Sequence, residues 1–337
     1  MTAVAITNEV MAAHHVRLGI AHFEYNEFAA AIERFDAALA YNPEDRYARY
    51  NRATALLSLG DYTRGFQEYE VAWRLFHWRG FGPVGNDIDR LMTLPLWRGD
   101  SDCRLLVYHE LGFGDAIMAM RYLPELKRRA GVTLVIDPCL TRLASSFDIY
   151  VMARVPDDLD SYDYRLPLFG VMAALDETEH TIPAEPYLLC EKCKQPNRAL
   201  TRDLPRIGIA WSGRTQTAFT LDRFLELLAL DGAALYALQP GPLARGDVEP
   251  LVPGSDFADV ADRIAAMDHI ISVDTAAIHL AGAMGHPSAH LLLPFLSDWR
   301  WHHTARWYPQ LKTYRQPTPN DWDTPFATLH ETLHARD

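Results

Sequence analysis

The stretch "CRLLVYHELGFGDAIMAMRYLPELKRRAGVTLVIDP", Cys103 to Pro138, decides the fold class. It opens with an apolar run of strand type, passes through a turn that holds two glycines and an acid, and continues as an amphipathic helix pattern. A second apolar run, "GVTLVIDP", follows that helix. A strand, a helix and another strand in this order form a parallel βαβ unit, so the stretch predicts an α/β domain.

The same alternation runs along most of the remaining chain. A helix pattern at residues 139–147 and a strand at 149–155 follow directly, and four prolines then mark a stretch from Pro183 to Pro205. After it the pattern predicts strands at residues 206–211, 234–240, 269–274 and 289–294, with helices at residues 221–230, 258–267, from 275 onward and at 322–335. Two such units predict two facing Rossmann-like domains with a cleft between them.

An internal repeat precedes the α/β part. Phe28 aligns with Tyr62 and Phe35 with Tyr69, both at an offset of 34 residues (62 − 28 = 34). This offset is the period of the helix-turn-helix tetratricopeptide repeat. Two repeats bury little apolar surface between themselves, so we expect the pair to lean on the next domain. A groove for a partner protein and a helical cap or dimer surface both agree with the pattern.

The predicted fold class is therefore α/β, with two facing Rossmann-like domains preceded by a short all-α tetratricopeptide segment. Composition shifts suggest where the parts divide. The predicted parts are tetratricopeptide-like helices at residues 1–78, an N-terminal Rossmann-like domain at 79–190, a linker at 191–205, a C-terminal Rossmann-like domain at 206–320 and a last helix at 321–337.

Charge and hydropathy exclude several kinds of partner. The 32 Lys and Arg residues face 44 Asp and Glu, and the formal charge of −12 disfavours nucleic acid and anionic membranes as ligands. The longest apolar run, Ala289 to Leu296, is far shorter than the ~20 residues of a membrane helix. The N-terminus has no signal-peptide pattern. We therefore expect a cytoplasmic protein without a membrane span.

The cysteines indicate a reducing compartment. Four cysteines in 337 residues are too few for a disulfide scaffold. Cys190 and Cys193 form a C-x-x-C pair, but the chain has no second ligand pair at zinc spacing. A plain linker pair is thus favoured over a zinc site, and we expect no metal.

The first strand-to-helix turn, "HELGFGD", carries Glu110, Gly112, Gly114 and Asp115. Ligands of parallel sheets bind at such turns, where glycines allow close approach and the helix amides carry partial positive charge. Asp115 has two possible roles, a helix cap or a general base that faces the cleft. The motif alone favours the cap. It is also no complete G-x-G-x-x-G fingerprint, because Ile117 occupies the third glycine position.

A second junction, "ISVDTAAIHLAGAMGHP" at Ile271 to Pro287, repeats the pattern of strand, acid and helix. Thr275 and Ala276 stand at the helix start, where unpaired amides and a hydroxyl form a cradle for phosphate. Asp274 would cap the helix or accept a hydrogen bond from a sugar hydroxyl. His279, one turn later, would contact a phosphate or only pack.

Four segments together resemble a known family: "ELGFGDAIMAMRYLP", "GIAWSG", "DFADVADRIAAMDHIISVDTAAIHLAGAMGHP" and "DWRW" with "WYP" and "YRQP" after it. They resemble bacterial tetratricopeptide-fused glycosyltransferases, which are related to the lipopolysaccharide heptosyltransferases. The resemblance extends from His14 to the C-terminus. It implies the GT-B fold, a nucleotide-sugar donor held mainly by the C-terminal domain, and inverting transfer to an acceptor hydroxyl, with the N-terminal Rossmann-like domain on the acceptor side.

The resemblance also implies roles for single residues. Asp115 matches the proposed catalytic base of the heptosyltransferases. The residues that match their donor-binding segment are Asp274, Thr275, Ala276 and His279. Ala276 stands where those enzymes have glycine. In place of their donor-phosphate lysine, this chain has Ser212, Gly213 and Arg214, of which Arg214 is able to bind phosphate through two hydrogen bonds.

The resulting hypothesis is a metal-independent glycosyltransferase whose donor is a substrate, so that no cofactor is needed. Gln239 is placed to contact the base or ribose of the donor. Glu110, Gly112, Gly114, Trp299 and Arg300 are predicted to line the acceptor side or the cleft, although packing in the core is an alternative for the tryptophan. The acceptor is a glycan or a protein recruited by the tetratricopeptide segment. The rival hypothesis is a tetratricopeptide adaptor with a degenerate, non-catalytic transferase domain.

Overall fold

The computed structural model describes residues 7–75, 85–188, 204–213, 219–230, 232–241 and 246–334. These residues form two compact units. The first takes the described residues of Met1–Gly80, Gly170–Ile182 and Leu296–Arg306, and the second takes those of Phe81–Phe169, Pro183–Phe295 and Trp307–Asp337. The Cys190–Cys193 pair and all but the last two residues of the predicted linker lie outside the described residues.

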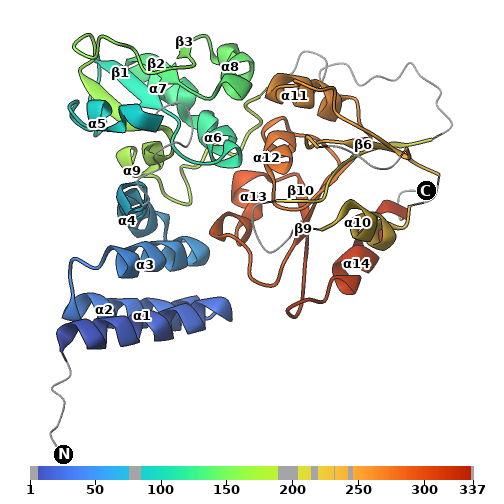
Figure 1. The fold of residues 1–337 in the computed structure, drawn as a ribbon, viewed down its shortest axis with the longest axis horizontal. Coiled ribbons are helices and arrows are strands. Elements are labelled where there is room, and N and C mark those ends of the chain that lie inside the picture. Colours follow the sequence, from blue (N-terminus) through green and yellow to red (C-terminus); the bar gives the residue numbers. More distant parts are fainter. Residues whose placement is uncertain are drawn as a thin grey trace, which may run out of the picture. The chain divides into compact units, whose positions relative to one another are not determined.

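Helices in the first unit stack in chain order (Figure 1). They are α1 (Asn8–Glu24), α2 (Phe28–Tyr41), α3 (Arg46–Leu59) and α4 (Tyr62–Leu75). Glycine allows each pair to approach closely. A Cβ on Gly19 of α1 would lie 2.5 Å from the Phe35 ring of α2, and one on Gly65 of α4 would lie 2.6 Å from the Leu57 side chain of α3. The helical hairpins are therefore closed at small residues, as tetratricopeptide packing requires.

Two segments from far along the chain complete this unit. Helix α9 (Val171–Ala174) packs on α4, and the 3-10 helix at Trp299–Trp301 packs on α3. The Trp299 ring lies 5.6 Å from Phe66 and 6.5 Å from Tyr62, measured between ring centroids. The repeat pair thus buries its inner face on these segments instead of on a third repeat.

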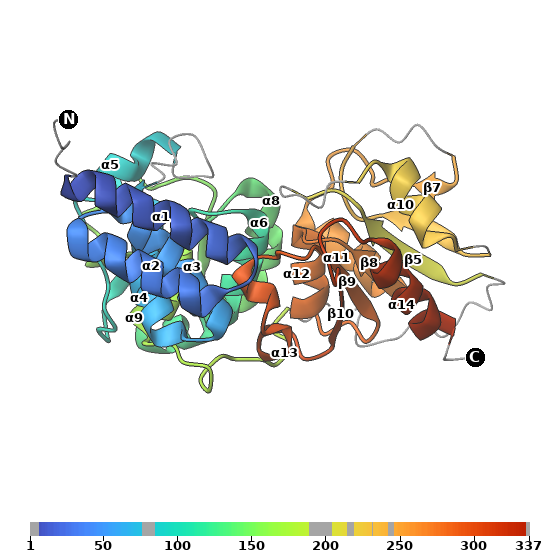
Figure 2. The ribbon, with the colours of Figure 1, turned by 90° about the horizontal axis from the view of Figure 1, so that it is seen from below.

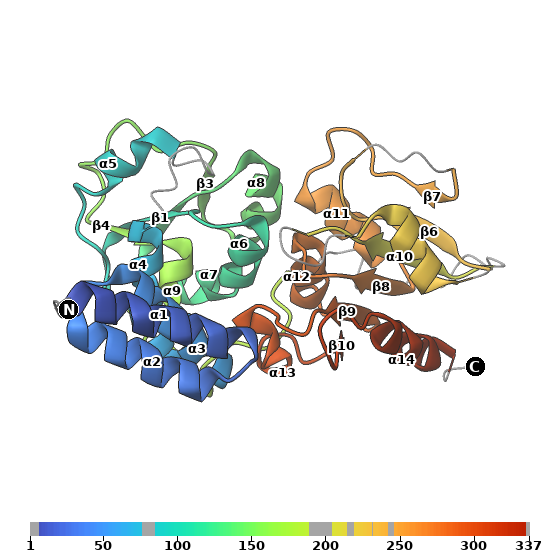
Figure 3. The ribbon, with the colours of Figure 1, turned by 60° about the horizontal axis from the view of Figure 1, so that its bottom comes forward.

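The first sheet of the second unit is parallel throughout, in the order β3-β2-β1-β4. Its strands are β1 (Arg104–Tyr108), β2 (Gly131–Val135), β3 (Tyr150–Met152) and β4 (Tyr164–Pro167). Side chains alternate between the two faces of β1, and Leu106 and Tyr108 pack with Leu91 of α5 (Ile88–Leu91). Helices α5 and α7 (Leu123–Arg129) lie on opposite sides of the sheet (Figure 3). Strand β4 was not predicted.

The amphipathic pattern after the glycine turn, "DAIMAMRYLPELKRR" at residues 115–129, predicts one helix, and this is wrong because the structure divides it. Helix α6 (Phe113–Ala119) passes through a 3-10 turn at residues 120–122 into α7. Pro124 lies in the first turn of α7, where a residue without a backbone N–H is tolerated. In the middle of one continuous helix the same proline would remove a hydrogen bond and clash with the preceding turn. The buried Arg121 donates from Nε to the Met118 carbonyl at 2.9 Å, and from Nη1 to the carbonyls of Pro183 and Trp307 at 3.0 Å each.

The second sheet is also parallel, in the order β10-β9-β8-β5-β6-β7. Its strands are β5 (Arg206–Ala210), β6 (Ala234–Ala237), β7 (Val248–Glu249), β8 (His269–Ser272), β9 (Ala289–Leu293) and β10 (Leu311–Arg315). Numbered in chain order, the strands follow 3-2-1-4-5-6, the order of the nucleotide-binding Rossmann fold. Strands β7 and β10 were not predicted.

Helices cover both faces of the second sheet (Figure 2). Helices α10 (Leu221–Leu228) and α14 (Asp323–His334) share a core with the sheet through Phe224 and Phe326, and α11 (Phe257–Ala265) and α12 (Ala276–Ala283) lie on the other face. The predicted fold class is therefore confirmed. In the described part of the chain, no helix combines the length and the apolar character needed to cross a membrane.

Candidate functional site

The second sheet places several predicted residues at its topological switch point. Strand β5 pairs with β6 on one side and β8 on the other, so the connections after β5 and β8 leave the sheet in opposite directions. Ser212 and Gly213 follow β5, and Asp274 and Thr275 follow β8. Open α/β sheets bind their ligands in the crevice at this point.

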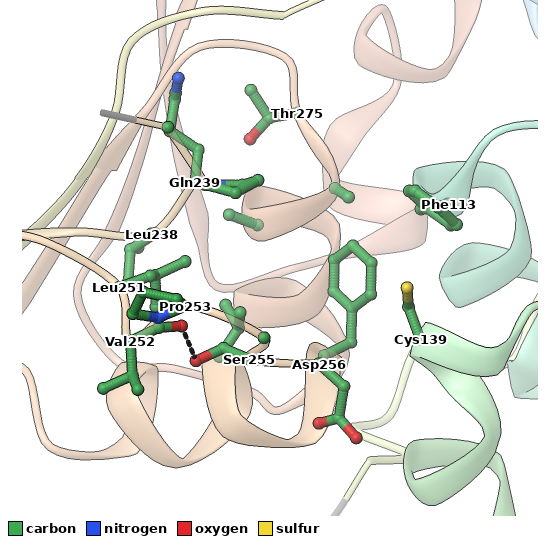
Figure 4. Close-up of a pocket in the computed structure, with 17 residues that line it drawn as sticks. Phe113, Cys139, Leu238, Gln239, Leu251, Val252, Pro253, Ser255, Asp256 and Thr275 are labelled. Carbon is green, nitrogen blue, oxygen red and sulfur yellow. Dashed lines mark hydrogen bonds between the residues drawn. The ribbon is translucent and has the colours of Figure 1, made fainter. Parts of the chain in front are cut away.

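A cavity of about 560 Å³ opens at the same edge (Figure 4). This volume lies within the range of small-molecule sites, and most of the lining is apolar. Phe113 of α6 and Cys139 of α8 (Pro138–Ala144) reach it from the first sheet. The remaining lining comes from the second sheet: Leu238, Gln239, Pro240, Gly241, Leu251, Val252, Pro253, Gly254, Ser255, Asp256, Phe257, Val260, Thr275, Ala276 and Ala277.

Helix α12 begins at the wall of this cavity. Thr275 is its N-cap residue, and no side chain accepts a capping hydrogen bond. The Thr275 hydroxyl lies 3.0 Å from Ser272 Oγ instead. Among the described residues, no hydrogen bond uses the backbone amides of Ala276 and Ala277. The cavity therefore meets hydrogen-bond donors at the positive end of a helix.

Gln239 presents a donor to the cavity as well. Its Oε1 accepts hydrogen bonds from the backbone amides of Trp211 at 2.8 Å and Ser212 at 3.1 Å. Only the oxygen of the side-chain amide accepts from an N–H group, so these two bonds fix which atom is oxygen. The Nε2 amino group is left for the cavity, at the end where Thr275 lies (Figure 4).

Two glycines bring the junctions together. A Cβ on Gly114, in the first junction, would lie 2.7 Å from Cδ2 of His279 in the second. A Cβ on Gly213 would overlap the backbone carbonyl oxygen of Asp274. Both positions therefore exclude a side chain, and contact between α6 and α12 depends on the first of them.

His279 is buried behind the cavity and does not line it. The residue is 4% exposed, and its Nδ1 lies 3.0 Å from the Tyr308 hydroxyl. Its Nε2 lies 4.0 Å from Asp274 Oδ1. Of the two roles considered for His279, contact with a phosphate or packing, the structure shows packing behind the cavity wall.

Asp115 occupies the third position of α6 and is half-buried. Its Oδ2 accepts a hydrogen bond of 3.0 Å from the backbone amide of Gly112, the N-cap residue. Asp115 is therefore not the N-cap that accepts from the helix amides, as one prediction had it, but it does bond the N-cap residue from inside the first turn. Its neighbour Phe113 lines the cavity, so the turn that holds Asp115 borders the same space.

Glu110 was predicted to line the acceptor side or the cleft, but the structure buries it. It is only 5% exposed, and its Oε1 accepts a 2.9 Å hydrogen bond from the backbone amide of Phe169. This bond joins the chain after β1 to the chain after β4. Burial raises the pKa of the Glu110 carboxyl to about 8, and the nearby charge of Asp115 adds to the effect. Glu110 holds the turn and is protonated at neutral pH.

Trp299 and Arg300 were also predicted to line the acceptor side or the cleft. This prediction is wrong, because both are buried in the first unit. Trp299 is 2% exposed against the helices, and Arg300 lies over its ring at 4.4 Å and pairs with Asp298 at 2.6 Å. Aromatic surface near a repeat pair is more stable between helices than in a wet cleft. Neither residue lines the cavity. Arg214 lies outside the described residues.

An aromatic pair lies at the cavity, and only one of its members, Phe257, belongs to a segment that the sequence predicted to line the cleft, residues 256–259; Phe113 was not predicted. Phe113 and Phe257 have ring centroids 5.1 Å apart. Next to them, Arg142 of α8 donates to Asp256 at 2.9 Å and to Asp259 at 3.0 Å. The segment before Phe257, "LVPGSDF", holds a proline and a glycine after β7, which was the available signal for a loop at the ligand edge.

The described residues contain no group of three or more His, Cys, Asp or Glu side chains that is arranged to hold a metal ion. Among the described residues that line the cavity, those with polar oxygen- or nitrogen-bearing side chains are Gln239, Ser255, Asp256 and Thr275. The Asp256 carboxylate is engaged, since it accepts from the amides of Ala258 and Asp259 as well as from Arg142.

A family model for the tetratricopeptide repeat matches residues 16–75. Residues 16–75 are tetratricopeptide repeats. This match confirms the segment predicted from the 34-residue offset, and its helices are α1 to α4.

Other proteins resemble larger parts of the chain. Protein FlbA of Caulobacter vibrioides is 24% identical over 381 residues, which cover 95% of this chain and 61% of FlbA. The chain therefore spans about three fifths of the length of this curated relative. Among solved structures, the iron-containing dodecameric glycosyltransferase TibC from enterotoxigenic E. coli H10407 is 12% identical, with a TM-score of 0.47, over 67% of this chain and 66% of TibC. The glycosyl transferase family 9 structure from Veillonella parvula is 12% identical, with a TM-score of 0.43, over 66% of this chain and 88% of that one.

Proposed function

We propose that the protein is an inverting, metal-independent glycosyltransferase that moves a sugar from a nucleotide-sugar donor to an acceptor hydroxyl. One observation carries the proposal. A cavity of ligand size lies at the switch point of the second sheet, and the groups it offers there are the α12 amides and the Gln239 amino group. Donors at a helix start are suited to a diphosphate, and apolar walls are suited to a nucleoside.

The proposed donor site takes its residues from both strand ends. The diphosphate is held by the amides at Ala276 and Ala277, beside the Thr275 hydroxyl, and Arg214 adds positive charge as the sequence predicts. Gln239 donates to the donor through Nε2, while Ser212 keeps Gln239 in place through its backbone amide. Asp274 accepts from a sugar hydroxyl. These contacts stabilise the nucleoside diphosphate as negative charge develops on it.

The proposed transfer is a single displacement. Asp115 removes the proton of the acceptor hydroxyl, and the acceptor oxygen attacks the anomeric carbon from the face opposite the diphosphate. The new glycosidic bond forms as the bond to the diphosphate breaks, so the anomeric configuration inverts. The nucleoside diphosphate leaves with the bonding electron pair. Gly114 lets α6 pack against His279 of α12, and Gly112, at the start of the same turn, is the proposed border of the acceptor side.

The tetratricopeptide helices supply the proposed site for a protein or glycan acceptor. Repeats of this type bind partners on their helical surfaces. An adaptor that binds partners through the same helices and has lost catalysis is the rival function, and the hydrogen bond from Gly112 to Asp115 is the observation that favours it.

The test is Asp115→Asn with donor binding and sugar transfer measured separately. The asparagine Oδ1 is still able to accept from the Gly112 amide, so the cap is kept and only the basicity is removed. We expect donor affinity to be unchanged and transfer to fall by about 10²–10⁴-fold.

The matched control is Asp259→Asn. Asp259 holds the same position in α11 and accepts from the N-cap amide of Asp256 at the same distance, 3.0 Å. We expect this variant to transfer sugar normally. Near wild-type transfer by Asp115→Asn would show that Asp115 is only a cap.

The donor is sought by calorimetry and thermal shift with ADP-, UDP-, GDP- and CMP-sugars, since a ligand that binds the folded state raises its stability. No response to any of them would favour the adaptor. With the donor found, we expect transfer to continue in excess chelator. Loss of activity that added metal restores would overturn metal independence.

A further inference from the structure

The wall that the first sheet contributes to the cavity meets the start of α11 through side chains of both. We propose that this contact is a latch, in which the ion pair from Arg142 to Asp256 holds α8 against α11 and releases when a ligand enters or leaves the cavity. The holding of α8 can be tested on the protein alone. The effect on exchange of a nucleotide-sugar rests on the proposed function.

Phe113 and Cys139 form the part of the cavity wall that comes from the first sheet, and Figure 4 shows both on the same side of the cavity. Each lies beside a contact with α11. Phe113 packs on Phe257 with ring centroids 5.1 Å apart. Arg142 follows Cys139 by one turn of α8 and pairs with Asp256 at 2.9 Å. The wall is therefore held at two points, and the partners at the start of α11 line the cavity themselves.

The Arg142 guanidinium contacts two carboxylates at once. Its Nη1 donates to Asp256 Oδ1 at 2.9 Å and to Asp259 Oδ1 at 3.0 Å. The same Asp256 oxygen caps α11 by accepting from the amides of Ala258 and Asp259. The partial positive charge of a helix start disfavours a cation, so the carboxylates are what make this position favourable for Arg142. Hydrogen bonds from the Asp256 backbone amide and from Arg142 keep the pKa of the Asp259 carboxyl below its usual value.

This contact is suited to opening because it is partly exposed to solvent. The Arg142 side chain is 58% exposed, and those of Asp256 and Asp259 are 18% and 42% exposed. Exposed ion pairs stabilise a contact only weakly, and salt screens them. Phe113 is 39% exposed, so the aromatic pair is also incompletely covered. The contact between α8 and α11 is thus weak enough to open and close while the fold persists.

The neighbouring contact between α6 and α12 is of a different kind. It is closed at Gly114, where a Cβ would lie 2.7 Å from the buried His279 ring. The buried Arg121, which follows α6, donates to the carbonyl of Trp307 before β10 at 3.0 Å. Closely packed buried contacts separate less easily than exposed ion pairs. We therefore expect α8 and α11 to part while α6 and α12 stay together.

The first test is amide hydrogen exchange of the full-length protein, measured on peptides by mass spectrometry. Arg142→Met removes the charge and keeps an unbranched side chain. We expect peptides that cover α8 and the start of α11 to exchange about twofold to fivefold faster in this variant, and peptides that cover α6 and α12 to be unchanged. Added salt should raise the exchange of α8 in the wild type toward that of the variant. Equal exchange of α8 and α11 in the two proteins would overturn the latch.

The matched control is Arg104→Met. The Arg104 side chain, at the start of β1, is 57% exposed and pairs with Asp163 at 3.0 Å, and neither residue lines the cavity. The control loses an ion pair of the same kind, so we expect its α8 and α11 to exchange as in the wild type. Faster exchange of these helices in both variants would mean that the loss of any such ion pair loosens them, which would contradict a latch.

The second test measures how fast a nucleotide-sugar enters and leaves, by stopped-flow mixing with whichever of the ADP-, UDP-, GDP- and CMP-sugars binds. A latch slows entry and exit alike. We therefore expect the association and dissociation rate constants of Arg142→Met to rise together, by about twofold to fivefold, while the dissociation constant changes by less than about twofold. A residue that only shapes the bound site would change the dissociation rate and the affinity together.

The outcomes separate the latch from the function. If a nucleotide-sugar binds and its rate constants are the same in wild type and Arg142→Met, the latch is wrong and the proposed function stands. If no nucleotide-sugar binds the wild-type protein, the proposed function fails, and hydrogen exchange still decides whether Arg142 holds α8 on α11. Asp259→Asn keeps the pair between Arg142 and Asp256, so its expected normal transfer holds under either outcome.

Discussion

The two strand-to-helix junctions of the second unit share a sequence pattern but differ in what their polar groups bind. After β1, the acid of the turn is taken up by its own backbone, as Asp115 accepts from the Gly112 amide. After β8, no side chain caps α12, and the first amides of the helix are left at a cavity. A strand, an acid and a helix in sequence therefore do not define a ligand site. The start of α6 has no side-chain cap either, and the difference is that the first residues of α12, Ala276 and Ala277, line a cavity.

The largest expected effect on donor affinity comes from Gly213, whose Cα lies against the backbone of Asp274 in the second junction. Gly213→Ala would place a Cβ on the carbonyl oxygen of Asp274, a backbone atom that is unable to rotate away. Overpacking of this kind costs about 3 kcal/mol, so we expect nucleotide-sugar affinity to fall by about a hundredfold in calorimetry. Gly246→Ala is the control, since no heavy atom lies within 4 Å of a Cβ there. Equal affinities would show that the junction rearranges without loss.

The next effect concerns the first junction, where Glu110 should make the free energy of unfolding depend on pH. The folded pKa of Glu110, about 8, lies above the unfolded value of 4.5. Between these values the unfolded chain has lost a proton that the folded chain keeps, so the unfolding free energy falls as pH rises through this window, by about 1.4 kcal/mol per pH unit. Below pH 4.5 the contribution is fully present.

Glu110→Gln isolates this contribution, because glutamine is still able to accept from the Phe169 amide but does not titrate. We expect the wild type to lose stability relative to the variant from pH 5 to pH 8 in denaturant titrations. Parallel curves for the two proteins would show that Glu110 is ionised in the folded state.

The smallest expected effect changes the charge of the second junction without moving it. In Gln239→Glu, one carboxylate oxygen is able to keep the bonds from Trp211 and Ser212, and the other replaces the amino group. We expect a nucleoside diphosphate to bind about tenfold more weakly, while the matching neutral nucleoside binds as before. An unchanged diphosphate affinity would place the phosphates away from Gln239.

Most of the sheet order followed from apolar runs, and the strands that escaped prediction have physical reasons. Strand β4 contains Arg165, whose buried guanidinium donates to the Leu94 carbonyl at 3.1 Å and to the Tyr108 hydroxyl at 3.2 Å. A charged residue interrupts the apolar pattern by which a buried strand is recognised, and the partners that allow its burial lie far away in the sequence. Strand β7 has two residues, and β10, "LKTYR", lies at the sheet edge and alternates in burial.

The site divides in the same way. Gln239, Thr275 and Ala276 were predicted because parallel strands deliver the residues after their carboxyl ends to one edge. The places of Trp299, Arg300 and Glu110 depend on partners such as Phe66 and Phe169, which no local pattern announces. The predicted roles of Asp115, Asp274, His279 and Arg214 stay predictions until donor binding and transfer are measured.

The segments that complete the tetratricopeptide unit also bear on how the chain folds during synthesis. His303 lies 3.1 Å from the Ser58 carbonyl, a contact that closes a loop of 245 residues. The repeats are therefore synthesised before both segments that cover them, residues 170–182 and 296–306. The apolar residues of α3 and α4 that these segments cover therefore stay exposed to solvent while the second unit is being translated. A chain that ends at residue 295 would lack the segment 296–306, so these apolar residues would stay exposed. We expect the need for chaperones to grow with the time between synthesis of the repeats and synthesis of that segment.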